Sequence, residues 1–140
     1  MDDTLSHLTG GCLCGAVRYE TSAPPLAMGF CHCRTCQRAT GSGYMPWVLM
    51  QADHVKVTGD YKEYQSIGES GKPVYRGFCT ECGSRVFFRG DVMPGLCTVS
   101  AASLDHPSLF KPQMHLWTED AQPWDCMSDE CPKLPRGPQQ

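Results

Sequence analysis

The chain has 140 residues, and its 12 lysines and arginines against 15 acidic residues give it a formal net charge of −3. The length is typical of one domain, and the scattered basic residues form no positive stripe, so we expect no nucleic-acid partner. The acidic N-terminus is not followed by an apolar signal segment, and no stretch approaches the roughly 18 apolar residues of a membrane span. We therefore expect no membrane partner and a cytoplasmic location.

Short alternating runs of apolar and polar residues predict strands, which we place at 15–20, 55–57, 61–67, 74–78, 86–89 and 96–101. Glycine-containing pairs and clusters at 59–60, 68–71 and 90–91 predict hairpin connections between them. The short, repeated spacing favours a mainly β, antiparallel fold. One short helix is expected at 34–40, ended by Gly41.

The composition changes after Trp124, where prolines crowd the last residues and few apolar side chains remain. We expect a single zinc-binding domain over 1–127 and an extended, proline-rich tail over 128–140. Cys126 and Cys131 flank this tail and are interpreted as free thiols.

Seven of the ten cysteines fall into three short clusters, which have the patterns CxC, CxCxxC and CxxC. Cytosolic thiols stay reduced, so close pairs of this kind favour metal binding over a disulfide framework. A thioredoxin-type redox pair would need a βαβ pattern, which the sequence lacks. The clusters are Cys12 and Cys14; Cys31, Cys33 and Cys36; and Cys79 and Cys82.

Four of these cysteines predict a closed structural zinc site. Two residues between Cys79 and Cys82 let both thiolates reach one ion, and Gly83 allows a tight turn behind them. Cys12 and Cys14, on a strand-like segment between glycines, are the best partner pair. The alternative is that all four are small buried apolar residues.

The remaining three cysteines predict a second, open zinc site. Cys31, Cys33 and Cys36 would come from a strand end and the first turn of a helix, and would leave the fourth position of the ion free for a substrate such as a thiol. The alternative is a closed site. Its fourth ligand would be His32, His115 or Cys97. His115 is also the histidine that we would test as an acid, although a packed histidine on a strand is the simpler interpretation. For Cys97, the simpler interpretation is a core residue.

Three segments together resemble the glutathione-dependent formaldehyde-activating enzyme family. They are GCLCGAVRY at 11–19, CHCRTCQR at 31–38 with Gly41, and FCTECGS at 78–84. The resemblance covers about residues 10–125, and Leu104-Asp105 and 115–117 also look like the C-terminal part of that family. It implies an Mss4-like, zinc-stabilised antiparallel β fold with one short helix.

The resemblance also implies a carbon–sulfur lyase activity, in which formaldehyde and glutathione join reversibly as S-hydroxymethylglutathione. Two zinc ions per chain are implied, a structural one and one at the reactive site, on the same two cysteine sets as above. Arg34, Gln37 and Arg38 could contact the carboxylates of a glutathione-like substrate, or form a solvated helix face. Trp47 could wall the substrate pocket or belong to the core.

Two functional hypotheses follow from the sequence. The first is a zinc-dependent carbon–sulfur lyase-type enzyme that acts on adducts of a small-molecule thiol and a small aldehyde. The second is a noncatalytic, zinc-stabilised binding module of Mss4-like fold. No residue in the sequence stands out as a dedicated general base.

Overall fold

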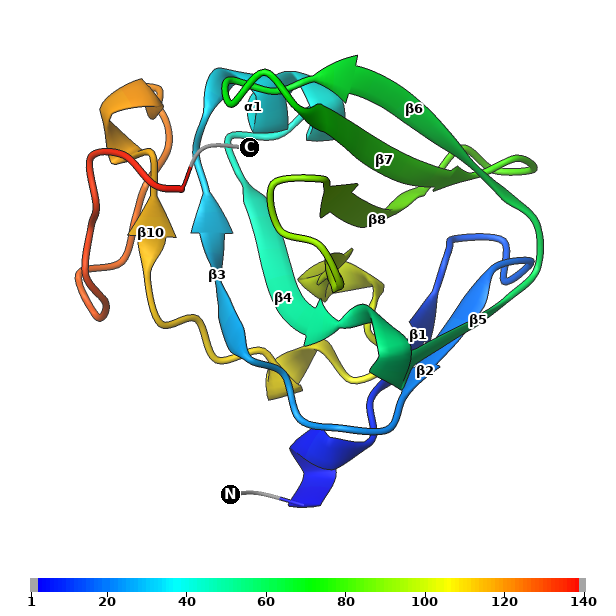
Figure 1. Cartoon of the computed structure of the whole chain (residues 1–140). Helices are drawn as coiled ribbons and strands as arrows, with labels where there is room; N and C mark the ends of the chain where they lie inside the picture. Colours follow the sequence, from blue (N-terminus) through cyan, green and yellow to red (C-terminus); the bar gives the residue numbers. More distant parts are fainter. Residues whose placement is uncertain (1–2, 139–140) are drawn as a thin grey trace.

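Two β-sheets dominate the computed structural model of this chain, which describes residues 3–138 (Figure 1). The smaller sheet has the order β1 (Thr9–Gly11), β2 (Arg18–Thr21) and β5 (Val55–Thr58). The larger sheet has the order β10-β3-β4-β9-β8-β7-β6. Its strands are β3 (Ala27–Cys31), β4 (Met45–Gln51), β6 (Tyr61–Ile67), β7 (Pro73–Cys79), β8 (Arg85–Gly90), β9 (Leu96–Ser100) and β10 (His115–Leu116). This arrangement confirms the predicted mainly β fold.

Neighbouring strands pair antiparallel, except that β10 runs parallel to β3. The predicted helix is confirmed as α1 (Arg34–Thr40), and Gly41 follows it with a φ of 71°, in the left-handed region that favours glycine. Short 3₁₀ helices are η1 (Asp3–Ser6), η2 (Ala52–His54), η3 (Ala101–Ser103), η4 (Pro107–Leu109) and η5 (Thr118–Asp120). Within residues 3–138, no helix is long and apolar enough to cross a membrane.

Two local predictions need correction. Gly59-Asp60 does not close a hairpin, because β5 pairs with β2 in the small sheet whereas β6 pairs with β7 in the large one. The connection instead carries the chain from one sheet to the other. Cys12 and Cys14 lie in the loop between β1 and β2 rather than on a strand. The hairpin at 68–71 between β6 and β7 is confirmed, as is the turn at 90–91 between the paired strands β8 and β9.

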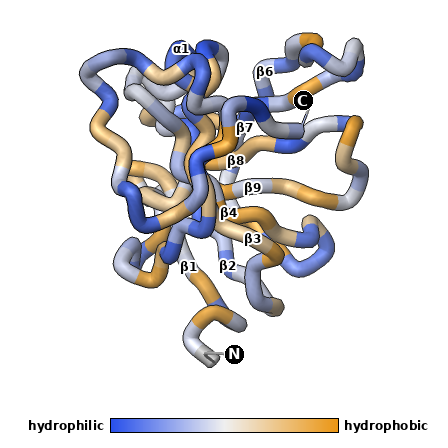
Figure 2. The backbone as a smooth tube through the Cα atoms, turned by 90° about the vertical axis from the view of Figure 1, so that its left-hand side faces the viewer, coloured by the Kyte–Doolittle hydropathy of each residue, from blue (hydrophilic) through white to orange (hydrophobic). Residues whose placement is uncertain are grey.

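The main core lies between the two sheets. It contains Val17 and Tyr19 from the β2 region together with Val48, Phe87 and Val99 from β4, β8 and β9. The rings of Tyr19 and Phe87 meet edge to face with centroids 5.7 Å apart, so the contact joins one sheet to the other. Figure 2 shows hydrophobic stretches along the central strands and hydrophilic loops around them. Burial of this apolar surface stabilises the packing of the sheets.

The segment after Trp124 returns to the edge of the large sheet beside β10 (Figure 1). The His115 N–H donates to the Pro132 carbonyl at 2.8 Å, and the Leu134 N–H donates to the His115 carbonyl at 2.8 Å. Further along, Gly137 packs close to the Trp117 indole. The proline-rich composition predicted an extended segment but gave no indication of these contacts.

Gly59→Ala tests the crossing between the sheets. Gly59 has a φ of 93°, and a Cβ there would lie 1.9 Å from the Ala16 carbonyl oxygen. Gly71 is the matched control, because its φ is 83° but an added Cβ would meet no atom within 4 Å. We expect Gly71→Ala to lower the free energy of unfolding by about 1–2 kcal/mol through backbone strain alone. Gly59→Ala should cost clearly more, and equal losses in urea titrations would contradict the steric argument.

Candidate metal centres and adjoining cavities

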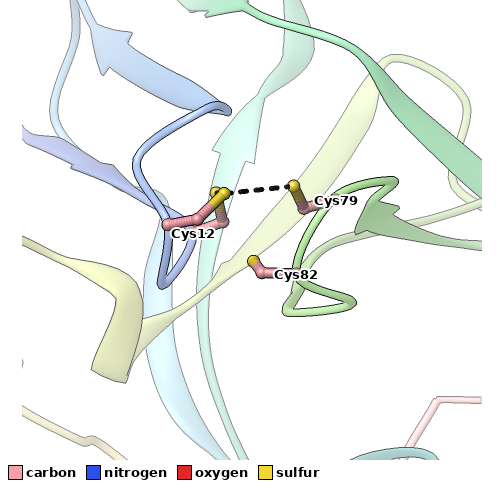
Figure 3. A group of neighbouring side chains, drawn as sticks. Cys12, Cys79 and Cys82 are labelled. Carbon is pink, nitrogen blue, oxygen red and sulfur yellow. Dashed lines mark hydrogen bonds between the residues drawn. The ribbon is translucent and has the colours of Figure 1, made fainter.

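Four cysteines converge where the two sheets meet. Cys12 and Cys14 come from the β1–β2 loop, whereas Cys79 ends β7 and Cys82 lies in the turn to β8. Their four sulfur atoms all lie within 4.8 Å of one another. The Cys14 sulfur is 3.7 Å from that of Cys12 and 3.8 Å from that of Cys79. Figure 3 shows the side chains of Cys12, Cys79 and Cys82 pointing toward one another. This set of thiols could hold one metal ion.

Local backbone turns place these thiols. Gly83 has a φ of 74°, and its N–H donates to the Cys79 carbonyl at 2.9 Å, which closes the turn between the two cysteines. The pKa of Cys82 is lowered to about 5, first by hydrogen bonding to the Ser84 hydroxyl and then by the N–H groups of Ser84 and Cys14. The Val17 N–H donates to the Cys12 sulfur at 3.2 Å. Donors of this kind favour thiolates, which are the metal-binding form of cysteine.

The second cluster is built on the β3–α1 junction. Cys31 ends β3, Cys33 is the N-terminal cap of α1, and Cys36 lies in its first turn. The three sulfur atoms lie within 4.8 Å of one another. The Cys36 N–H donates to the Cys33 sulfur at 3.3 Å. Hydrogen bonds from Cys31 and Cys36, with backbone N–H groups, hold the pKa of Cys33 well below its usual value, so its thiolate forms first.

None of the three candidate fourth ligands joins this cluster in the described part of the chain. His32 Nδ1 lies 2.5 Å from a carboxylate oxygen of Asp125, and its Nε2 lies 2.9 Å from Nδ1 of His115. Both histidines are therefore engaged away from the sulfur atoms. Cys97 is on β9, where burial raises its pKa to about 11. Among residues 3–138, the structure thus brings together three thiols with no fourth histidine, cysteine or carboxylate ligand beside them.

The buried pair of His32 and Asp125 was not predicted from the sequence. Their side chains are 1% and 2% exposed, although Asp125 lies in the proline-rich C-terminal region. The His115 ring stacks on Phe30 with centroids 4.9 Å apart, and burial lowers the pKa of His115. This network fixes His32 between two cysteines of the cluster and anchors the C-terminal segment beside it.

An apolar cavity of about 110 Å³ adjoins the three-cysteine cluster. Cys31 and Cys36 form part of its wall, and Trp47 lines it while also packing against the small buried cluster that contains both cysteines. Other lining residues are Met45, Leu49, Arg85, Phe88, Met93, Thr98, Leu116, Trp117 and Pro138. We call this space the apolar cavity.

A second cavity, of about 170 Å³, lies on the Cys33 side of the cluster. Arg34, Arg76 and Asp120 contribute to its lining, and Trp117 lines both cavities. Trp117 has a φ of 58°, the one positive φ of a non-glycine residue within residues 3–138. Such strained backbone is typical of functional sites, and here it places the indole between the two cavities.

The helix residues predicted to contact substrate differ in their surroundings. Arg34 lines the second cavity and donates to the Gln37 side-chain oxygen at 2.6 Å. The Gln37 amide donates to the carbonyls of His32 and Asp120, so this buried side chain ties α1 to neighbouring segments. Arg38 is exposed and lines neither cavity.

Comparisons with known proteins agree with this geometry. The family model described as glutathione-dependent formaldehyde-activating enzyme matches residues 7–120. A Halomonas elongata protein named "Putative glutathione-dependent formaldehyde-activating enzyme" is 31% identical over 125 residues, which cover 84% of this chain and 78% of that protein. The crystal structure of a Rhodobacter sphaeroides protein matches with a TM-score of 0.58 and 23% identity, over 89% of this chain and 98% of that one, and shows a similar fold.

The chain therefore belongs to the glutathione-dependent formaldehyde-activating enzyme family, and the resemblance seen in the sequence is confirmed.

Asp125→Asn tests the buried network. The change replaces the carboxylate that pairs with His32 by a neutral amide, and we expect a loss of about 1–2 kcal/mol in unfolding free energy, because a charge-assisted hydrogen bond becomes a weaker neutral one. Asp129→Asn is the control, since Asp129 is 93% exposed and pairs with Lys133 at the surface. Its effect should stay below about 1 kcal/mol. Denaturant titrations of both variants measure the difference, and equal effects would show that the network does not stabilise the fold.

Proposed function

We propose that this protein is a carbon–sulfur lyase-type enzyme that holds two zinc ions and reversibly joins a thiol to a small aldehyde. The observation that carries the proposal is the set of three convergent thiols, with no fourth protein ligand within residues 3–138, next to a cavity. Membership of the family supports glutathione as the thiol and formaldehyde as the aldehyde. We propose a cytoplasmic location, where the thiols stay reduced.

The donor sets fit zinc at both clusters. All seven candidate ligands are sulfur atoms, and soft thiolates prefer zinc over the hard, oxygen-binding cations. Cys12, Cys14, Cys79 and Cys82 would complete a tetrahedral set, whereas Cys31, Cys33 and Cys36 would leave one position open. Zinc at the open site would supply Lewis-acid stabilisation of a substrate thiolate or carbonyl oxygen.

The reaction proceeds without any net oxidation. The substrate sulfur attacks the aldehyde carbon, a carbon–sulfur bond forms, and the electrons of the carbonyl π bond move to the oxygen. The oxygen then takes the proton that the thiol has lost, which gives the S-hydroxyalkyl product. The reverse steps release both reactants.

The chain contributes position and environment to this reaction. Trp47 and Trp117 form aromatic walls beside Cys31 and Cys36, and so limit the water that can reach the bound reactants. Holding two small reactants against one wall raises their effective concentration. His32, fixed by Asp125, keeps the backbone between two cysteines in one conformation.

Metal content tests the two-site arrangement. We expect two zinc ions per chain by elemental analysis, and Cys36→Ser should lose one of them and remain folded. Cys79→Ser should unfold, because structural zinc contributes about 10–16 kcal/mol in peptide systems, which rivals a total stability of about 5–15 kcal/mol. Cys97→Ser, outside both clusters, is the control and should keep both ions. Full zinc content in Cys36→Ser would argue against the second site.

Exchange NMR tests the activity directly. A mixture of formaldehyde and glutathione should interconvert with S-hydroxymethylglutathione faster when the protein is present. Cys33→Ala should abolish the acceleration while circular dichroism shows an intact fold, and Cys126→Ala, at an exposed thiol, should leave it unchanged. If the wild-type protein with two zinc ions gave no acceleration at high concentration, it would not catalyse the reaction of formaldehyde with glutathione. The noncatalytic binding module would then be the better interpretation.

A further inference from the structure

Within residues 3–138, two arginines beside the three-cysteine cluster form no ion pair with an aspartate or glutamate. Arg76 on β7 is 6% exposed, and Arg85 at the start of β8 is half-buried. Within residues 3–138, Nε of Arg76 and both Nε and Nη1 of Arg85 are buried without a hydrogen-bond partner. The Nη1 group of Arg76 donates to the neutral Ser66 hydroxyl at 3.3 Å. Buried donors of this kind are costly unless a ligand satisfies them.

Both side chains face the candidate site. Arg85 lines the apolar cavity together with Cys31 and Cys36, and Arg76 lines the second cavity together with Cys33. The Arg76 guanidinium also lies over the Phe88 ring, 5.2 Å from its centroid, and Phe88 is part of the apolar wall. Arg85 therefore lies on the apolar-cavity side of this wall, and Arg76 lies on the side of the second cavity.

The local charges do not balance. Burial lowers the pKa of Arg85, and repulsion by Arg76 lowers it further, but an arginine stays protonated in proteins. One zinc ion with three thiolates would carry a single negative charge, and two guanidiniums carry two positive charges. Glu69 and Asp120 line the second cavity, yet among the described residues neither forms an ion pair with these arginines. One positive charge thus remains without a counter-ion.

We propose that the apolar cavity binds a carboxylate-bearing substrate, with its carboxylate on Arg85 and its apolar body against Trp47, Phe88 and Met93. Arginine suits this role because its planar fork pairs with both oxygens of a carboxylate. Arg76 lies against the Phe88 ring of this cavity and adds to the positive potential inside it. The inference rests on the proposed function and extends it: among aldehydes larger than formaldehyde, the enzyme favours those that carry a carboxylate on an apolar or aromatic body.

Binding of benzoate tests the site without any thiol or aldehyde. Benzoate has the carboxylate and the apolar ring, and benzamide is its neutral counterpart of similar shape. By calorimetry on the two-zinc protein, benzoate should bind at least about tenfold more tightly than benzamide. Arg85→Met should remove that preference and leave benzamide binding unchanged. Arg38→Met, at an exposed arginine that lines neither cavity, should have no effect.

Zinc analysis of each variant separates the possible results. A protein that keeps both ions but loses the benzoate preference supports the proposal, and Arg85→Lys, which keeps the charge but not the fork, should bind with intermediate strength. Loss of one zinc ion in Arg85→Met would overturn it, because the guanidinium would then serve as counter-ion of the metal cluster. Undiminished benzoate binding in that variant would also overturn it, because the carboxylate would then lie on the metal.

The activity measurements and the binding measurements test the two proposals independently. If exchange of formaldehyde and glutathione is not accelerated but benzoate binds through Arg85, the anion site stands and the proposed lyase reaction falls. With an active enzyme, 4-carboxybenzaldehyde should be favoured over benzaldehyde at least about tenfold in kcat/KM, and Arg85→Met should abolish that ratio. Equal use of the two aldehydes by the wild-type protein would overturn the proposed substrate class.

Discussion

Four thiols from two distant parts of the chain meet at the junction of the two sheets, and the rest of the structure depends on that meeting. The β1–β2 loop brings Cys12 and Cys14, and the β7–β8 turn brings Cys79 and Cys82. The same junction aligns Tyr19 against Phe87 and closes the main core. A small domain has limited apolar surface to bury, so a metal held by four sulfur atoms at this point would add a large share of the folding free energy.

The second cluster differs because its three thiols come from one local segment. The end of β3 and the cap of α1 place Cys31, Cys33 and Cys36 together within one short segment. The tertiary structure then decides what surrounds them. The buried pair of His32 and Asp125 holds one side, and Trp117 separates two cavities on the other. If both sets of cysteines bind zinc as proposed, a saturated site and an unsaturated one would occupy different parts of the same fold, one suited to stability and the other to chemistry.

Two arginines place positive charge beside the three-cysteine cluster. Thiolates that bind a metal lower its Lewis acidity, so additional positive charge nearby helps to hold anionic reactants. Arg76 on β7 and Arg85 on β8 would supply that charge, and the mainly apolar wall around Arg85 would strengthen the interaction. The apolar cavity and its arginine would thus offer the proposed substrate two distinct contacts next to the three sulfur atoms.

The sequence by itself determined the three short cysteine clusters, the helix at 34–40 and the hairpin at 68–71, because each depends on spacing within a few residues, which constrains the backbone directly. It also contained the family resemblance. Only the tertiary structure decided that β5 and β6 belong to different sheets, that Asp125 reaches His32, and that Arg76 and Arg85 flank the cluster. These contacts join residues far apart in the chain, and they follow from strand order and register, which local patterns of hydrophobicity do not specify.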